Sequence, residues 1–148
     1  ASGSGLARPT TARVAGRAGY DRIVFEYAGT ALPSLTVTSV VPPFARDPSG
    51  KPMTVAGKVF LRIVFRDVPG VLSGYSGPTT FRAGLPVLTD LELSGDFEGV
   101  QGWVAGLSGQ ACIRVFTITS PSRLVLDLAA SSAPALPKAG QRPDAARP

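Results

Sequence analysis

Short segments in which apolar and polar residues alternate dominate this sequence, and glycines and prolines separate them. The 148 residues include 17 glycines and 14 prolines, which favour many short elements joined by turns over long helices. Alternation with a period of two is typical of strands that bury one face. About seven to eight such strands predict an all-β fold, a β-sandwich of two small sheets, with a barrel as the alternative. The expected strands lie at residues 23–27, 35–41, 59–66, 87–94, 100–107, 113–119 and 123–129.

Three segments predict further features of the fold, two within the sheets and one between strands. Residues 124–126 are all apolar before Asp127, which is typical of a central strand covered on both faces. Asp90 and Glu92 fall on the same side of their strand, so we expect them on an outer face in contact with water. Residues 69–86 show no periodicity and predict a long loop.

The chain divides into one folded domain and two polar end segments. Residues 1–10 contain a Ser-Gly repeat with too little apolar surface to pack, which predicts a flexible spacer. Residues 131–148 are rich in proline, alanine and basic residues and predict a disordered tail. Residues 11–130 form the expected single domain, because 44% apolar composition supplies a core for one domain of this size.

The net charge of +5 comes from the two ends. Residues 1–19 contribute +3 and residues 134–148 contribute +2, while the segment between them has nine basic and nine acidic residues. A neutral domain binds duplex phosphates poorly, so we predict no nucleic-acid partner. The basic ends would be attracted to anionic wall polymers or headgroups mainly at low ionic strength.

Residue types exclude most catalytic sites. The chain has no histidine, which excludes serine or cysteine nucleophiles activated by histidine and histidine-rich zinc sites. Cys112, the single cysteine, is expected to be buried in the core. Asp96 and Glu98 fit a turn, a ligand contact or the carboxylate pair of a glycosidase, and two acids fall short of a calcium site. We predict no enzyme, no cofactor and no metal.

Aromatic residues next to charged ones are the better candidates for binding. Tyr20, Asp21 and Arg22 precede a strand, and Trp103 follows the Asp96 turn. An aromatic face beside acids and arginines can hold a sugar ring by stacking and hydrogen bonds. The alternatives are that Trp103 belongs to the core and that Arg22 or Arg123 forms a buried ion pair with Asp127.

Three phrases of the sequence together resemble the AMIN-like domains. They are GYDRIVFEY at residues 19–27, GDFEGV at 95–100 and PSRLVLDL at 121–128, and the resemblance covers residues 11–130. It implies a sandwich of two small sheets in an exported protein or lipoprotein of high-GC Gram-positive bacteria. It also implies a targeting module without catalysis, related to the AMIN modules that hold partner enzymes at peptidoglycan.

We therefore expect a non-catalytic, monomeric module of the cell envelope or extracellular space that binds peptidoglycan or another wall glycan. A lipid anchor on the full-length precursor fits this expectation, and no apolar run approaches the roughly 20 residues of a membrane span. The alternative is an adaptor for envelope proteins that adds a partner strand at an open sheet edge. The predicted ligand-binding residues are Tyr20, Asp21, Arg22, Asp96, Glu98, Trp103 and Arg123.

Overall fold

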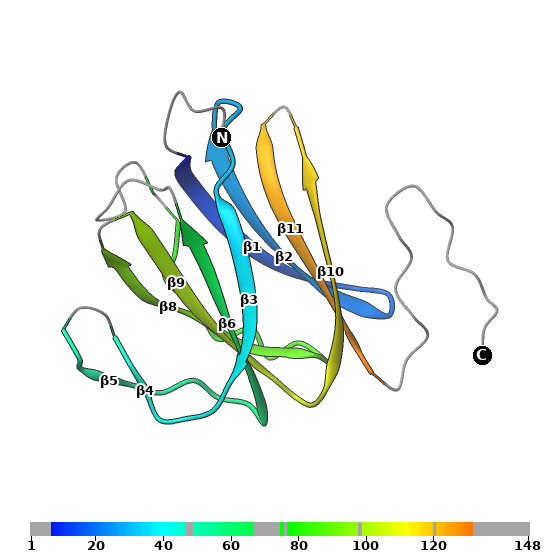
Figure 1. Ribbon diagram of the computed structural model, residues 1–148. Helices are drawn as coiled ribbons and strands as arrows, with labels where there is room; N and C mark the ends of the chain where they lie inside the picture. Colours follow the sequence, from blue (N-terminus) through cyan, green and yellow to red (C-terminus); the bar gives the residue numbers. More distant parts are fainter. Residues whose placement is uncertain are drawn as a thin grey trace.

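The computed structural model describes residues 7–46, 49–66, 75, 77–97, 99–119 and 121–131, and this part of the chain contains strands and no helix (Figure 1). All strand pairs are antiparallel and form two main sheets. Sheet A has the order β1-β2-β11-β10, sheet B has the order β3-β6-β9-β8-β7, and β4-β5 is a separate hairpin. The predicted β-sandwich is therefore confirmed. The strands are β1 (Arg8–Arg17), β2 (Tyr20–Ala28), β3 (Ser34–Val40), β4 (Phe44–Ala45), β5 (Pro52–Met53), β6 (Val59–Arg66), β7 (Thr80–Phe81), β8 (Leu88–Phe97), β9 (Val100–Leu107), β10 (Ala111–Ile118) and β11 (Ser122–Ala130).

Eight of these strands have seven residues or more, and the seven predicted segments coincide with all of them except β1. Residues 8–10, which the sequence assigned to the spacer, belong to β1 instead, where Pro9 is buried. The sequence of β1 lacks a clear alternation of apolar and polar residues, so this strand was not predicted. The two-residue strand β7 lies within the predicted loop at 69–86. Residues 1–6 and 132–148 lie outside the described part.

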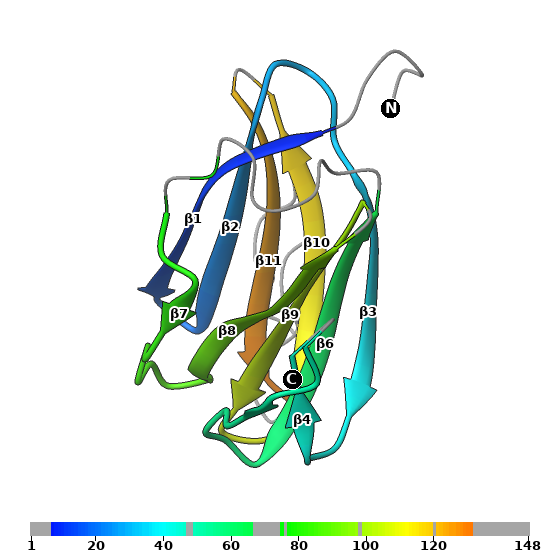
Figure 2. The same cartoon turned by 90° about the vertical axis from the view of Figure 1, so that its left-hand side faces the viewer.

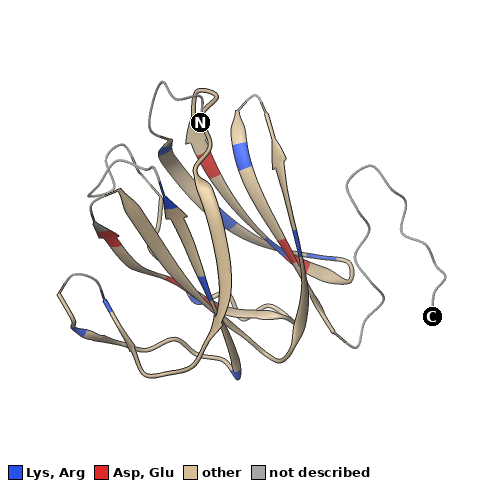
Figure 3. Cartoon of the chain, viewed as in Figure 1, with Lys and Arg blue, Asp and Glu red and all other residues tan. Residues whose placement is uncertain are grey.

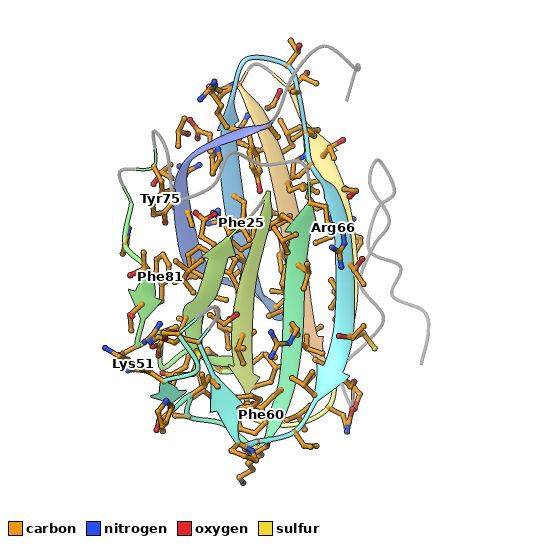
Figure 4. The ribbon with its side chains drawn as sticks, turned by 60° about the vertical axis from the view of Figure 1, so that its left-hand side comes forward. Phe25, Lys51, Phe60, Arg66, Tyr75 and Phe81 are labelled. Atoms are coloured by element: carbon orange, nitrogen blue, oxygen red, sulfur yellow. The ribbon has the colours of Figure 1, made fainter. Side chains whose placement is uncertain are left out.

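The main core fills the space between the two sheets. Inward side chains of β2 and β11 face those of β6, β8 and β9, as the period of two requires. At its centre Phe25 lies 4.7 Å from Phe65 and 5.4 Å from Trp103 between ring centroids (Figure 4). β11 pairs with β2 and β10, which confirms its predicted central position.

A second, smaller core lies on the outer face of sheet B. The β4-β5 hairpin and the segment after it pack onto this face (Figure 4). The segment crosses β9 so closely that a Cβ added to Gly106 would lie 1.9 Å from the Ala56 carbonyl oxygen. The sheet accepts this cover because glycine has no side chain at the crossing. The second core consists of Phe44, Met53, Val55, Phe60 and Val104.

Candidate functional site

Strand register divides the predicted site residues between two faces of the sandwich. Tyr20, Arg22 and Arg123 occupy outward positions on β2 and β11, and the structure brings them onto one face of sheet A. Asp21 and Trp103 point inward instead. Glu98 lies outside the described residues. The seven predicted residues therefore do not form a single site.

Asp21 is a buried structural acid. It is 1% exposed, and its Oδ2 accepts hydrogen bonds from the backbone N–H groups of Val87 (2.6 Å) and Leu88 (2.8 Å). These bonds join the start of β8 in sheet B to β2 in sheet A. The residue is adjacent in sequence to Tyr20 and Arg22, but the alternation of the strand turns its side chain to the opposite face.

Trp103 is a core residue, which corrects its placement among the ligand contacts. Its side chain is fully buried, and its Nε1 donates to Gln101 Oε1 at 2.9 Å. The ring also lies near Tyr75 and Phe81, so its faces are covered by protein. Asp96 pairs with Gln101 and shares the inward row of Phe65, so it also lies apart from Tyr20 and Arg22.

The outward face of sheet A carries an ion cluster around Asp127. Arg22 binds this carboxylate in a bidentate manner, with Nε 2.7 Å from Oδ1 and Nη2 2.9 Å from Oδ2. Arg114 of β10 reaches Oδ2 at 3.1 Å. The hydrogen bond to Asp127 raises the pKa of Arg22 above its ordinary value. The predicted ion pair of Arg22 with Asp127 is present. Arg123 lies four residues before Asp127 on β11, and its register partner on β2 is Glu26.

Two aromatic rings flank the guanidinium groups of this cluster. The Arg22 guanidinium carbon lies 5.6 Å from the Tyr20 ring centroid and 5.3 Å from that of Phe116. The Arg114 carbon lies 4.5 Å from the Phe116 centroid. Both rings are half-buried. Asp127 is fully buried although none of the described strands forms a second layer over it, because the arginines and rings around it exclude water.

Figure 3 marks the charged residues along the strands, and strand register gives the outward face of sheet A an excess of positive charge. Downstream of the β-bulge between Pro9 and Thr11, register and alternation place five arginines and two acids on it, an excess of three positive charges. Two of these three excess charges are Arg13 and Arg17, which the sequence count assigned to the basic end, and the third arises because acids of the neutral middle, such as Asp21, are buried elsewhere. We call this surface the arginine face, and its charged residues are Arg13, Arg17, Arg22, Arg114, Arg123, Glu26 and Asp127.

Sequence reasoning missed Arg114 and Phe116 as members of this face. The alternation within residues 113–119 places them on the same side of a strand, but it does not identify the neighbouring strand. It also missed Arg13 and Arg17, which were assigned to a charged end instead of an edge strand. Only the antiparallel register β1-β2-β11-β10 brings these side chains together.

A second ion cluster on sheet B corrects the prediction that Asp90 and Glu92 are solvated. Both acids are on the outer face as expected, but they are 4% and 3% exposed. Arg82 Nη1 lies 2.6 Å from Asp90 Oδ2, the Ala56 N–H also donates to this oxygen at 2.7 Å, and Arg46 donates to Glu92. The sequence analysis did not predict the β4-β5 hairpin that helps to bury the two acids, and they were therefore expected to be in contact with water.

No group of three or more histidine, cysteine, aspartate or glutamate residues in the described part of the chain is placed to hold a metal ion. Cys112 is exposed on β10, contrary to the expectation that it is buried, because it points outward from an edge strand. In the same part of the chain no helix is long and apolar enough to cross a membrane.

Comparison with known protein families identifies the family of this chain. The family model of the AMIN-like domain matches residues 7–130, which includes every described strand. No curated protein matches the chain.

Proposed function

Because the chain belongs to the AMIN-like domain family, whose members are envelope modules, we propose that it is a non-catalytic module that binds the cell wall through the arginine face. The ligand class is peptidoglycan or an associated anionic glycan. The observation that carries this proposal is the excess of three positive charges on a sheet face that no described strand or hairpin covers.

The charge excess has the chemistry of an anion-binding surface. Arginine binds carboxylate and phosphate groups with geometric specificity, and such groups recur along wall polymers. Asp127 holds the Arg22 and Arg114 guanidiniums in fixed positions, so less side-chain entropy is lost when a ligand binds. The arginine face as a whole carries five arginines and two acids, and this excess attracts an external anion.

The aromatic rings add a second kind of contact. Tyr20 and Phe116 are half-buried beside the guanidiniums, so part of each ring faces the surface where a sugar ring would lie. Aromatic rings contribute apolar contact to sugars, and the Tyr20 hydroxyl adds a polar group. The combination suits a carboxylated glycan better than a duplex, whose phosphates need no aromatic contact.

The location that follows from this function is the cell envelope or the extracellular space. An exported protein would meet a wall polymer without crossing another barrier. A lipid-anchored precursor would hold the domain within reach of the wall, so the anchor also belongs to the proposal. In this proposal the domain binds the cell wall, and any catalysis is carried out by a partner protein.

Co-sedimentation with insoluble peptidoglycan at low and moderate salt tests the proposal. We expect the unaltered chain to sediment with the wall and to retain part of its binding at moderate salt. The double substitution Arg17→Gln with Arg123→Gln should lower the bound fraction about tenfold, because two phosphate- or carboxylate-binding groups are lost from the face. Neither arginine holds Asp127, so the fold should persist.

The matched control removes two arginines from the other outer face. Arg62 and Arg66 lie on β6, and their register places them on the outside of sheet B. Arg66 is labelled in Figure 4. Arg62→Gln with Arg66→Gln changes the net charge equally and should leave wall binding near the unaltered level. Equal losses in the two double variants would reduce the interaction to general charge attraction. Absence of wall binding by the unaltered chain would contradict the proposed function.

A further inference from the structure

The two lateral sides of the sandwich differ in how their edge strands are protected. β1 and β7 lie at one side, and β3 and β10 lie at the other (Figure 2). β1 carries a bulge between Pro9 and Thr11 together with several arginines, and β7 has only two residues. Bulges, charges and short length all discourage the pairing of an edge with another chain. This side is therefore closed to strand addition.

The edge strand β10 has none of these protections except one charge. Its eight residues contain no proline, and its register with β11 is continuous from Ala111 to Ile118 without a bulge. No described strand pairs with its other side. An exposed, regular strand of this length is a template for an additional strand.

The hydrogen-bond pattern identifies which residues face outward. The Ser131 N–H donates to the Gln110 carbonyl at 2.9 Å, which makes this pair a hydrogen-bonded one in register with β10 and β11. Bonded and non-bonded pairs alternate along an antiparallel ladder. Residues 112, 114, 116 and 118 therefore bond to β11. The residues whose N–H and C=O groups point to the open edge are Ala111, Ile113, Val115 and Thr117.

The side chains at the same positions present apolar surface. Ile113 and Val115 point toward the inner side of sheet A, yet they are 37% and 42% exposed. They are two of the three large apolar residues that are exposed among the described residues, and the third is Val41. Backbone donors and acceptors at the edge thus coincide with uncovered apolar side chains, which is the arrangement that β-augmentation uses.

Charge decides what kind of strand would fit. Between Ile113 and Val115, Arg114 points to the arginine face beside Arg22, and that face carries five arginines and two acids. A second copy of this chain paired at β10 would add two further guanidiniums at the same place. Like charges across a strand pair destabilise it, and opposite charges contribute up to about 1 kcal/mol. An acidic strand is therefore the complementary partner.

We propose that β10 binds an extended segment of another protein, which becomes the fifth strand of sheet A. The segment has apolar residues opposite Ile113 and Val115 and an acidic residue between them, opposite Arg114. Backbone hydrogen bonds from the four outward-facing residues of β10 supply the pairing. This site adjoins the arginine face but does not depend on wall binding.

Titration of the full chain with a synthetic strand tests the proposal. The probe is acetyl-Thr-Val-Glu-Val-Glu-Val-Thr-amide, and the control peptide has lysine in place of both glutamates. We expect amide chemical shifts and hydrogen-exchange protection to change at residues 111–118. The glutamate peptide should bind at least about fivefold more tightly than the lysine peptide, since one favourable cross-strand charge pair is exchanged for a repulsive one.

Backbone methylation separates strand addition from other modes of binding. Methylation of the peptide amides that face β10 should abolish binding, while methylation of the alternate amides should leave it unchanged. Val115→Pro removes an outward N–H without removing a bond to β11, and it should also abolish binding, whereas Val115→Thr should not. Three results would each overturn the proposal. The glutamate and lysine peptides could bind equally, the two methylated peptides could bind equally, or the peptide could leave residues 111–118 unchanged.

Discussion

The ion clusters on the two outer faces of the sandwich both bury carboxylates beneath arginines, but the two clusters differ in charge balance and in cover. On sheet B, Asp90 and Glu92 meet Arg46 and Arg82, so two negative charges match two positive ones. Both arginines come from outside the long strands, and the β4-β5 hairpin covers the cluster with apolar side chains. On sheet A the carboxylate of Asp127 meets two arginines of the sheet itself, and no hairpin in the described part of the chain covers them.

This difference assigns separate roles to similar chemistry. A balanced cluster that ties a covering segment to a sheet stabilises the fold, and it leaves little charge for a ligand. An unbalanced cluster on an open face needs only enough carboxylate to fix its arginines, and the excess remains available for binding. The comparison predicts that substitutions on sheet B change stability alone, whereas those on sheet A affect stability or wall binding according to their contact with Asp127.

The largest stability effect is expected for Asp127→Asn. The substitution removes the carboxylate that Arg22 and Arg114 share, and their side chains are each 20% exposed, so water compensates them poorly. Loss of one partner from a buried ion cluster costs about 3 kcal/mol. Urea denaturation followed by tryptophan fluorescence measures it. A decrease of less than about 1 kcal/mol in the free energy of unfolding would show that water reaches both guanidiniums. Asp127 would then not hold Arg22 and Arg114 in fixed positions on the arginine face.

The cover of sheet B provides the second test. Gly106→Ala places a Cβ against the Ala56 carbonyl oxygen, so the crossing segment must move away from β9. Overpacking of this kind costs about 2 kcal/mol. Gly109→Ala is the matched control, because an added Cβ there has no neighbour within 4 Å, and it should change stability by less than about 0.5 kcal/mol. Wall binding of the folded Gly106→Ala protein should be unchanged, and its loss would contradict the separation of the two faces.

The fold could be predicted largely from the sequence because the alternation reports burial directly. Seven strands, the central place of β11 and the outward orientation of Asp90 and Glu92 follow from periods of two and from apolar runs. The hairpin that covers these acids has strands of only two residues, too short to show any period. Its absence from the prediction explains why the acids were expected in water.

The candidate site was less predictable because it depends on pairs of strands distant in sequence. Tyr20, Asp21 and Arg22 are adjacent in the chain, and only the pleat of β2 separates Asp21 from the other two. Arg114 reaches Asp127 through the register of β10 with β11. Nothing in a single strand identifies its neighbour, so the sequence located the charged residues but not the face that they share.

Neutralising one acid of sheet B should have a smaller effect than neutralising Asp127. In Glu92→Gln, Asp90 still compensates Arg82, and the arginines are 61% (Arg82) and 41% (Arg46) exposed, so water solvates the remaining charge. We expect a loss of about 1 kcal/mol in the free energy of unfolding, from one charge-assisted contact. Denaturation under the conditions used for Asp127→Asn gives the comparison. A loss equal to or greater than that of Asp127→Asn would show that the balance of charges does not distinguish the two clusters.

The smallest stability effect is expected for Arg13→Gln. This substitution tests whether the exposed arginines of the arginine face contribute to the free energy of unfolding or only to wall binding. Arg13 lies 3.2 Å from Glu26, but its side chain is 50% exposed and that of Glu26 is 26% exposed. A surface ion pair of this kind contributes less than about 0.5 kcal/mol, because solvent screens the charges and ordering the side chains costs entropy. The substitution should nevertheless weaken peptidoglycan co-sedimentation at low salt, since it removes one of five arginines from the face. A loss of more than about 1 kcal/mol without a change in co-sedimentation would mean that the exposed arginines of sheet A stabilise the fold as those of sheet B do, and the contrast between the two faces would disappear.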